Sequence, residues 1–220
     1  MNAGQPLRER TVTGLHAGLA DRVAALVPRD APILDVGCGS GAWLQRLRQL
    51  GFTKLTGADH DTAQFALDGV RVCPADLDAE RWFDDAPSYR LITAIEVIEH
   101  LQNIGNFLAN AQRLLAPGGY LLLTTPNVHS LHARLRFLLT ADVKQFGRIG
   151  DVTHLYPLLQ STARRLAARH GFELAAQWGF PASGDAVAAR RWVNLAFRLL
   201  RHLLPEPIPG DVYCLLLRKP

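Results

Sequence analysis

Short apolar runs alternate with longer amphipathic segments along most of the chain. Residues 31–36 form an apolar run that is followed by a glycine, and the leucines of residues 42–50 then recur at helical spacing. A short apolar run bounded by turn residues is typical of a buried strand, and leucines three and four positions apart are typical of a helix that covers a sheet. The first unit is therefore a strand, a glycine-rich loop and a helix.

The same alternation is repeated after residue 50. Further apolar runs predict strands, and the stretches between them predict helices. The predicted strands are 54–58, 70–73, 91–94 and 120–125, and the predicted helices are 62–67 and 107–115. Strands that are separated by helices pair in parallel through right-handed connections. The pattern predicts an α/β fold with a doubly wound, mostly parallel sheet.

Both ends of the chain extend this unit within a single domain, residues 1–220. Residues 7–26 predict a helix that ends at Val27-Pro28, because the residue before a proline avoids the α region, and residues 1–29 form an N-terminal helical segment. Near the other end, residues 158–170 predict a helix, and residues 172–178 and 211–218 predict strands that pair antiparallel at one edge of the sheet. Two remaining segments are expected to act as acceptor-side lids: residues 126–157 and 180–210.

Composition narrows the classes of protein without naming one. Of the 220 residues, 48% are hydrophobic and 20% charged, which is typical of a globular domain and excludes wholesale disorder. The net charge of +4 is scattered, with no run of five basic residues, so nucleic acid is not favoured as a partner. The apolar runs are far shorter than the ~20 residues that cross a bilayer, and no signal pattern opens the chain. We expect a cytoplasmic protein.

The cysteines do not suggest a disulfide framework or a zinc site. Cys38, Cys73 and Cys214 are three in number and lack CxxC spacing. We expect them to be small buried residues.

The glycine loop after the first strand is the strongest candidate for a ligand site. It reads Asp35-Val36-Gly37-Cys38-Gly39-Ser40-Gly41 and lies where open α/β sheets bind ligands. Glycines there adopt unusual dihedral angles and let a ligand approach the backbone closely. Gly37, Gly39 and Ala42 also satisfy a loose dinucleotide fingerprint. A nicotinamide dinucleotide therefore stays open at this point.

Acidic residues follow the predicted strands and favour a cationic cofactor. Asp59 ends the second strand, where a carboxylate can accept hydrogen bonds from both ribose hydroxyls of either cofactor. Asp76 and Leu77 follow the third, where a side chain can meet an adenine amino group. Asp35 would lie awkwardly near a pyrophosphate, but it suits a ligand that carries an ammonium and a sulfonium group.

Five ordered segments together resemble the motifs of class I S-adenosylmethionine-dependent methyltransferases. They are ILDVGCGSGAWL at 33–44, the acid in LTGADHD, ADL at 75–77, ITAIEVIEHL at 92–101 and LAPGGYLLLTTPN at 115–127. The resemblance implies a Rossmann-like, seven-stranded sheet with an antiparallel C-terminal strand, and S-adenosylmethionine as cofactor. It also implies a set of cofactor-binding residues: Asp35, Gly37, Gly39, Asp59, His60, Asp76, Leu77 and Glu96.

The cluster EVIEH follows the fourth predicted strand. In a helical turn, Glu96, Glu99 and His100 would share one face. Two carboxylates and an imidazole on one face would repel or take up protons unless a cation joined them, and such oxygen and nitrogen ligands suit Mg2+, Mn2+ or a borderline metal.

EVIEH is similar to the motif of the ubiquinone-pathway O-methyltransferases and the small-RNA terminal 2'-O-methyltransferases. In those families two glutamates, a histidine and a later histidine bind a divalent cation, and His154 stands where the later histidine would be. The chain departs from them at Leu155-Tyr156-Pro157, where flanking acidic and aromatic residues are missing. The resemblance implies metal ligation by Glu96, Glu99, His100 and His154.

Two other interpretations of this cluster stay open. His154 or His100 could act as a metal-free general base, with Glu96 beside it, or the cluster could have no catalytic role. His129 and His132 are further candidates that we expect to face the substrate or to be exposed.

Residues 186–204 predict one amphipathic helix with no acidic residue. Its apolar side carries Trp192 and Leu199, and its other side carries arginines. Such a helix covers a core or lies on an anionic membrane surface. We expect the apolar side to face protein and the arginines to face outward, with peripheral membrane contact through 186–204 as the alternative.

These observations converge on a methyltransferase that uses S-adenosylmethionine to methylate an oxygen of a small or lipid-linked hydroxylated acceptor. The alternatives are an NAD(P)-dependent oxidoreductase and a non-catalytic S-adenosylmethionine-binding protein. The sequence determines neither the acceptor nor the oligomeric state.

Overall fold

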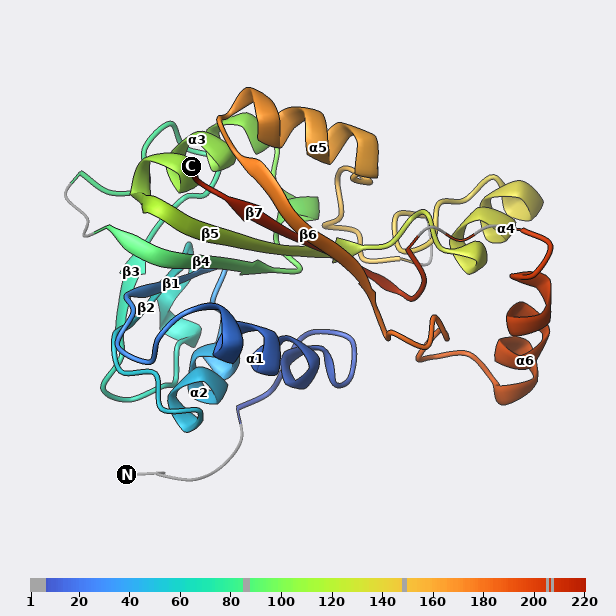
Figure 1. Cartoon of the computed structure of the whole chain (residues 1–220), viewed down its shortest axis with the longest axis horizontal. Helices are drawn as coiled ribbons and strands as arrows, with labels where there is room; N and C mark the ends of the chain where they lie inside the picture. The colour runs from blue at the N-terminus through green and yellow to red at the C-terminus, as the bar shows by residue number, and fades with distance from the viewer. Residues whose placement is uncertain (1–6, 85–87, 148–149, 205, 207) are drawn as a thin grey trace.

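Seven strands form one sheet in the order β3-β2-β1-β4-β5-β7-β6 (Figure 1). The computed structural model describes residues 7–84, 88–147, 150–204, 206 and 208–220. Strand β7 runs antiparallel to both β5 and β6, and the pairs among β1 to β5 are parallel. The predicted α/β sheet with an antiparallel C-terminal strand is confirmed. The strands are β1 (Ile33–Val36), β2 (Leu55–Asp59), β3 (Arg71–Pro74), β4 (Tyr89–Ile95), β5 (Leu115–Pro126), β6 (Glu173–Phe180) and β7 (Val212–Arg218).

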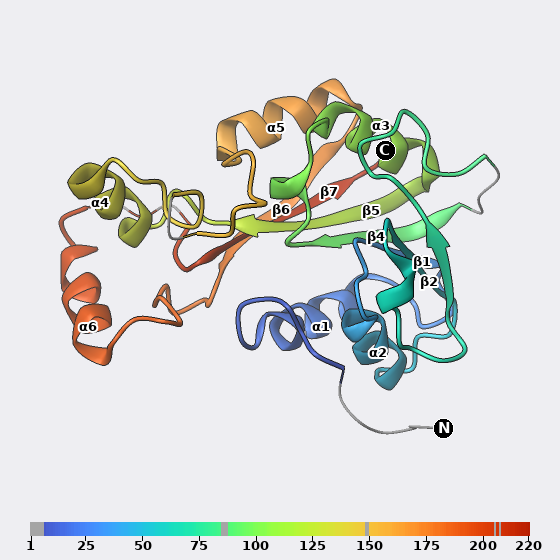
Figure 2. The same cartoon turned by 180° about the vertical axis from the view of Figure 1, so that it is seen from behind.

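Helices cover both faces of the sheet. Helices α1 (Leu15–Leu26) and α2 (Ala42–Gln49) lie on one face, and α3 (Ile104–Leu114) and α5 (Gln160–Arg169) lie on the other (Figure 2). Side chains of a strand alternate between the faces, so neighbours separate into two cores. Leu91 packs in the core under α1 and α2, whereas Ile92 packs with Phe107 of α3. Burial on both faces explains why these strands are continuously apolar.

Two helices lie beyond the carboxyl ends of β4 and β5. Helix α4 (Leu131–Thr140) contacts α6 (Arg191–Leu200), and both project from the end of the sheet (Figures 1 and 2). The ring of His132 stacks on Phe197 with 3.6 Å between centroids, and the Leu131 amide donates to Glu206 at 2.8 Å. We call residues 131–140 and 186–204 the α4–α6 lobe.

Several predicted helices are shorter than expected. The helix predicted for 7–26 begins only at Leu15, because Gly14 has a left-handed conformation (φ 83°) at its N-terminus. The helix predicted for 62–67 is a single 3-10 turn, Thr62–Gln64, and ends before Phe65, which is extended. The helix predicted for 186–204 is limited to Arg191–Leu200, and the backbone of Ala186 instead bonds to the side chain of Asn194.

The expected orientation of the 186–204 helix is wrong. The side chains of Trp192 and Leu199 are 78% and 65% exposed, and α6 has no buried residue. Arg198 and Arg201 bond instead to protein atoms of residues 183–185. The side of the helix with Asn194, Phe197 and Arg201 therefore faces the protein, and the side with Trp192 and Leu199 faces outward.

The expected burial of the cysteines is confirmed for two of the three. Cys38 and Cys214 are buried and Cys73 is partly buried, and all three are free thiols. No helix in the described part of the chain is both long and apolar enough to cross a bilayer. Residues 1–6 of the expected N-terminal segment, and 148–149, 205 and 207 of the expected lids, lie outside the described residues.

The position of β7 between β5 and β6 makes Leu215 a test of the antiparallel edge. Leu215 is 2% exposed and pairs with Leu123 and Gln177. Leu215→Ala should lower the free energy of unfolding by about 2–5 kcal/mol, because the cavity left in a packed core is not refilled. Urea denaturation measures this loss. The matched variant Leu174→Ala, at a β6 site that is 42% exposed, should lose less than about 1 kcal/mol. Equal losses would contradict the burial of β7.

Candidate active site

The glycine loop turns sharply between β1 and α2 and leaves room for a ligand. Gly37 and Gly39 have φ values of 69° and 50°, which side-chain-bearing residues rarely adopt. A Cβ at Gly37 would lie 2.5 Å from Val97, whereas a Cβ at Gly39 would meet no described atom within 4 Å. Gly37 is thus required for packing, and Gly39 faces open space that a ligand can enter.

Asp35 is a buried carboxyl group at the end of β1, held by a chain of hydrogen bonds. The Trp43 indole donates to Thr93 at 3.1 Å, and the Thr93 hydroxyl donates to Asp35 Oδ1 at 2.7 Å. Burial raises the pKa of Asp35 to about 7, although the Thr93 hydrogen bond opposes this shift. Without a ligand, Asp35 is therefore partly protonated at neutral pH, and a nearby positive charge would stabilise its ionised form.

Asp59 fastens the glycine loop to the end of β2. Its Oδ2 accepts the Gly39 amide at 2.8 Å, and its Oδ1 accepts the Asp61 amide and contacts His60 Nδ1, both at 3.1 Å. Each carboxylate oxygen has two lone pairs, so acceptor capacity is left for a ligand. His60 is largely exposed at the rim of the same space.

A large cavity of about 540 Å³ lies over the glycine loop, and a smaller one of about 340 Å³ adjoins it beyond β3. Asp35, Gly37, Gly39 and Asp59 line the larger cavity, and Asp76 and Leu77 line the smaller one. Among the predicted residues, Gly37, Asp59, His60 and Glu96 line both. The structure thus brings all eight predicted cofactor residues to the walls of two adjoining cavities.

A further cavity of about 490 Å³ adjoins the large one on the side of the α4–α6 lobe. Five residues line both of these cavities: Arg10, Thr11, Glu96, His100 and Asp151. A cofactor over the glycine loop and a second substrate beside the lobe would meet at this shared wall.

The expected helical turn from Glu96 to His100 is wrong. Glu96 is in the left-handed region (φ 55°), and only Ile98–His100 form a 3-10 turn. The Glu96 amide and Oε1 both bond to the Thr124 hydroxyl, at 2.9 and 3.0 Å. Burial raises the pKa of Glu96 to about 7. Glu96 therefore points toward the end of β5 instead of sharing a helix face with Glu99.

Glu99, His100 and His154 converge. One ligand atom from each lies within 4.8 Å of the others, and the His100 and His154 rings are 4.7 Å apart. Backbone hydrogen bonds position His154, because the Leu155 and Tyr156 amides donate to the Glu99 carbonyl. Glu96 is not part of this three-residue group.

Glu99 is completely buried, and neither carboxylate oxygen has a hydrogen-bond partner among the described residues. Burial and the negative charge of Glu96 raise the pKa of Glu99 well above its usual range. A buried acid without partners is unfavourable, and a cation or a donor in this position would remove the penalty.

Both histidines are oriented by acceptors on their Nδ1 atoms. His100 Nδ1 lies 3.2 Å from the Thr153 carbonyl and 2.9 Å from the Thr153 hydroxyl, which donates to Asp151 at 2.6 Å. His154 Nδ1 lies 3.0 Å from the Gln145 carbonyl. An Nδ1–H that donates to a carbonyl leaves the Nε2 lone pair free, which is the arrangement found around metal-binding and basic histidines. Burial, together with His154, lowers the pKa of His100 and so favours its neutral form.

The other two histidine candidates are placed elsewhere. His129 Nε2 accepts the Gln160 amide at 3.1 Å, at the start of α5. His132 stacks on Phe197 inside the lobe. Neither lines the two large cavities, so the expectation that they face the substrate finds no support in their positions.

Sequence reasoning missed the N-terminal and loop residues of the site. Arg8, Arg10 and Thr11 reach the cavities because residues 7–14 are not helical, and Asp151 and Thr153 reach them because their loop docks on Glu99. Two sequence features could have indicated these residues: Gly14, directly before the N-terminal helix begins, and the DVTH segment at 151–154.

The geometry of the glycine loop and of the acids beside it fits a class I S-adenosylmethionine-dependent methyltransferase, and comparison with known proteins identifies the class. The chain belongs to the methyltransferase-domain family, whose model matches residues 10–177. This membership confirms the resemblance seen in the motifs, and it decides against the nicotinamide-dependent oxidoreductase.

Curated relatives match part of the chain. A "Ubiquinone biosynthesis O-methyltransferase" of Pseudomonas paraeruginosa (strain DSM 24068 / PA7) is 31% identical over 131 residues, which are 56% of this chain and 54% of the relative. A protein of the same name from Caulobacter sp. (strain K31) is 31% identical over 105 residues, or 43% of this chain and 40% of the relative. The chain thus spans about half the length of these relatives or less.

Solved structures share the whole fold at low identity. A "SAM dependent methyltransferase" from Archaeoglobus fulgidus matches with a TM-score of 0.61 and 16% identity, covering 95% of both chains. An S-adenosylmethionine-dependent methyltransferase from Mesorhizobium loti has a TM-score of 0.61 and 17% identity, covering 94% of this chain and 100% of its own. At such identities the likeness shows the fold alone.

The raised pKa of Asp35 makes stability depend on pH in the absence of ligand. Its pKa is about 7 in the folded protein, against an ordinary value of 3.8. The folded state holds the proton more tightly, so this contribution to stability is present near pH 4 and is lost as pH rises through 7. Asp35→Asn should therefore raise the urea midpoint at pH 8 relative to wild type, with a smaller gain at pH 4. Asp21→Asn, at an exposed site of α1, should show no such difference, and a pH-independent effect of Asp35→Asn would contradict the assignment.

Proposed function

We propose that the protein transfers the methyl group of S-adenosylmethionine to an oxygen of a small or lipid-linked hydroxylated acceptor, with a divalent cation held by Glu99, His100 and His154. The observation that carries the proposal is the convergence of these three residues beside the wall shared by the two cavities. The relatives named for O-methylation in ubiquinone biosynthesis support the choice of oxygen and of a lipid-linked acceptor.

The cofactor end of the site would be held by residues from three strand ends. Asp59 would accept hydrogen bonds from the ribose hydroxyls, with His60 at the rim, and Asp76 and Leu77 would line the adenine position. Asp35, Gly37 and Gly39 would lie beside the methionine part, where the ammonium group stabilises a carboxylate. Glu96 lines the cavities on both sides of the reacting centre.

The residues of the cluster fit a divalent cation. Glu99 offers two unpartnered carboxylate oxygens, and His100 and His154 offer Nε2 atoms whose rings are fixed through Nδ1. One carboxylate and two imidazoles are ligands for Mg2+, Mn2+ or a borderline metal such as Zn2+. Held by these three residues, a cation would supply Lewis-acid chemistry that lowers the pKa of an acceptor hydroxyl. Glu96 lies outside the three-residue set, so we propose it as a neighbour of the acceptor and not as a ligand.

The same geometry also supports a mechanism without a metal, in which a histidine acts as the general base. His100 is held in one orientation by Thr153 and Asp151, its lowered pKa keeps it neutral, and its Nε2 is free to take a proton from the acceptor. His154 has an equivalent free Nε2. In either case the protein contributes mainly by holding two reactants in line and excluding water.

The role of Asp59 is tested by cofactor affinity. Asp59→Ala should weaken S-adenosylmethionine binding about 10- to 100-fold, because charge-assisted hydrogen bonds of about 1.5–3 kcal/mol are lost. Isothermal titration calorimetry measures the change. Asp59→Asn can still accept the Gly39 amide through its carbonyl oxygen. It therefore separates the hydrogen bond that holds the glycine loop from the hydrogen bonds to the ribose. Unchanged affinity in folded variants would remove this assignment.

The metal is tested first without any acceptor. Titration of Mn2+ followed by electron paramagnetic resonance should show one site in the wild type and at least tenfold weaker binding in Glu99→Gln and His154→Ala. His202→Ala, at an exposed position after α6, is the matched control and should bind Mn2+ as the wild type does.

Turnover then separates the mechanisms. With labelled S-adenosylmethionine and a panel of hydroxylated aromatic and polyprenyl acceptors, a chelator should abolish methyl transfer and leave cofactor affinity intact. Full activity in chelator, with loss of activity in His100→Ala, would instead assign a metal-free base. Tight cofactor binding without transfer to any acceptor in the panel would favour the non-catalytic alternative.

A further inference from the structure

Helix α6 packs on the protein through Phe197 and several polar side chains, and most of its large apolar side chains are in solvent. Asn194 bonds to both the amide and the carbonyl of Ala186 at 3.2 Å, and Arg198 forms an ion pair with Asp185. Arg201 donates to the Ser183 carbonyl at 2.9 Å and pairs with Glu206 at 2.5 Å. These contacts fix the rotation of the helix about its own axis.

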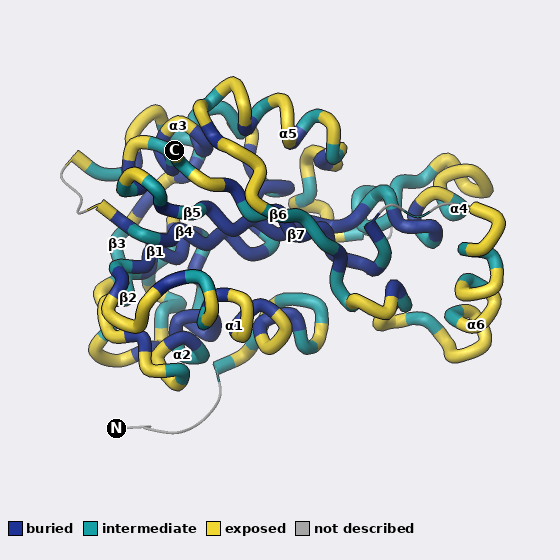
Figure 3. Tube along the Cα trace, viewed as in Figure 1, coloured by how far each residue is buried: buried dark blue, intermediate teal, exposed yellow. Residues whose placement is uncertain are grey.

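The outward side of α6 and the end of α4 are strongly apolar. Trp192, Leu195, Leu199 and Leu203 recur at helical spacing and are 78, 52, 65 and 78% exposed. Residues 137–139 at the end of α4 are also exposed, and Figure 3 shows both helices mostly exposed at the far end of the molecule. Large side chains gathered on one projecting element are unfavourable in water and mark a docking surface.

The charge around this surface is positive. Residues 186–204 contain no acidic residue, and Arg190 and Arg191 at the start of α6 are exposed without an ion pair to any described residue. The nearest acids, Asp185 and Glu206, are already paired with Arg198 and Arg201. The surface therefore offers apolar side chains and unpaired cations together.

We propose that the α4–α6 lobe docks on the surface of an anionic lipid bilayer. A tryptophan and leucines on one side of a helix, with arginines beside them, are the composition that inserts at the boundary of headgroups and acyl chains. A second copy of the chain fits less well, because a symmetric contact between two such surfaces would bring Arg190 and Arg191 together with their own copies and with no acid to pair them.

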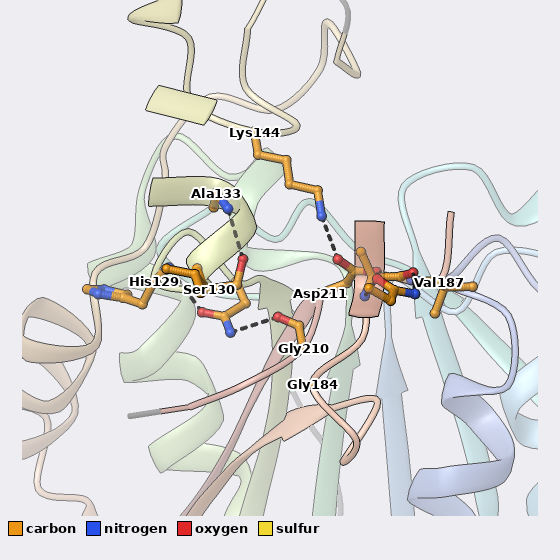
Figure 4. Close-up of polar contacts among 12 residues, drawn as sticks. His129, Ser130, Ala133, Lys144, Gly184, Val187, Gly210 and Asp211 are labelled. Atoms are coloured by element: carbon orange, nitrogen blue, oxygen red, sulfur yellow. Dashed lines mark hydrogen bonds and ion pairs between the residues drawn. The ribbon is translucent and has the colours of Figure 1, made fainter. Parts of the chain in front are cut away.

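Docking would place the second cavity at the membrane. Arg136 of α4 and Lys144 after it line the 490 Å³ cavity, and Lys144 is tied to the end of the sheet by an ion pair of 2.5 Å with Asp211 (Figure 4). The Asp211 carboxylate also accepts the Val187 amide at 2.7 Å, so it joins residues 186–204 of the lobe, and Lys144 after α4, to the start of β7. The lobe is thus anchored to the site and not only to itself.

Vesicle flotation of the full chain, without cofactor or acceptor, tests this proposal independently of the proposed function. The protein should float with vesicles that contain phosphatidylglycerol and much less with pure phosphatidylcholine vesicles, and added salt should weaken binding. Leu199→Ser should lower the partition coefficient roughly tenfold, because one leucine that would insert into the bilayer is lost. The double variant Arg190→Gln, Arg191→Gln should lower it at least tenfold for the anionic vesicles alone.

Leu174→Ser, an exposed leucine at the start of β6, is the matched control and should float as the wild type does. Melting temperatures of all variants should equal that of the wild type within a few degrees, since none of the changed side chains is buried. Absence of flotation, or equal flotation of Leu199→Ser and wild type, would overturn the proposal. A doubled mass in sedimentation that Leu199→Ser abolishes, with no vesicle binding, would assign the surface to a second copy instead.

Discussion

Three carboxyl groups that end or follow central strands share one edge of the sheet, and most of the site depends on how their charge is compensated. Parallel strands β1 and β4 both end at this edge, so Asp35 and Glu96 line one cavity although they are far apart in the sequence, and Glu99 is close enough to Glu96 for the two charges to interact. Burial raises the pKa of each of them. A site with three carboxyl groups whose pKa values are raised is suited to cationic ligands. An ammonium-bearing cofactor and a divalent metal are both ligands of this kind.

The polypeptide around these acids is arranged to leave them available. Thr93 and Thr124 each donate one hydroxyl, to Asp35 and Glu96, and Glu99 receives nothing from the described residues. The Glu99 carbonyl, in contrast, accepts the backbone that follows His154. The side chain that we propose as a ligand and the main chain that holds the second histidine nearby thus belong to the same residue.

The α4–α6 lobe follows a different physical rule from the sheet. In the sheet, apolar side chains are buried on both faces, and polar groups gather at the strand ends. In α6, Asn194, Arg198 and Arg201 hold the helix to residues 183–186 and Glu206. Phe197 packs on His132, but the side with Trp192 and Leu199 is exposed. Large apolar side chains on the exposed side of a helix are unfavourable in water, but they are favourable where that side contacts lipid.

The sequence by itself determined the α/β class, the alternation of strands and helices along the chain, and the glycine loop with the acidic residues that line the cavities beside it. Local patterns carry that information: apolar runs mark buried strands, and the loop from Asp35 to Gly41 needs conformations that glycine supplies. Tertiary structure alone decided the rest. Periodicity says that α6 has an apolar side but not which way it points, because hydrogen bonds to residues 183–186 set the rotation. The spacing of Glu96 from Glu99 suggested a shared face, yet the left-handed backbone at Glu96 and its bonds to Thr124 of β5 separate the two. The resemblance grouped His154 with Glu99, but the backbone contact that holds them together joins residues more than 50 positions apart in the chain, and no local pattern predicts it.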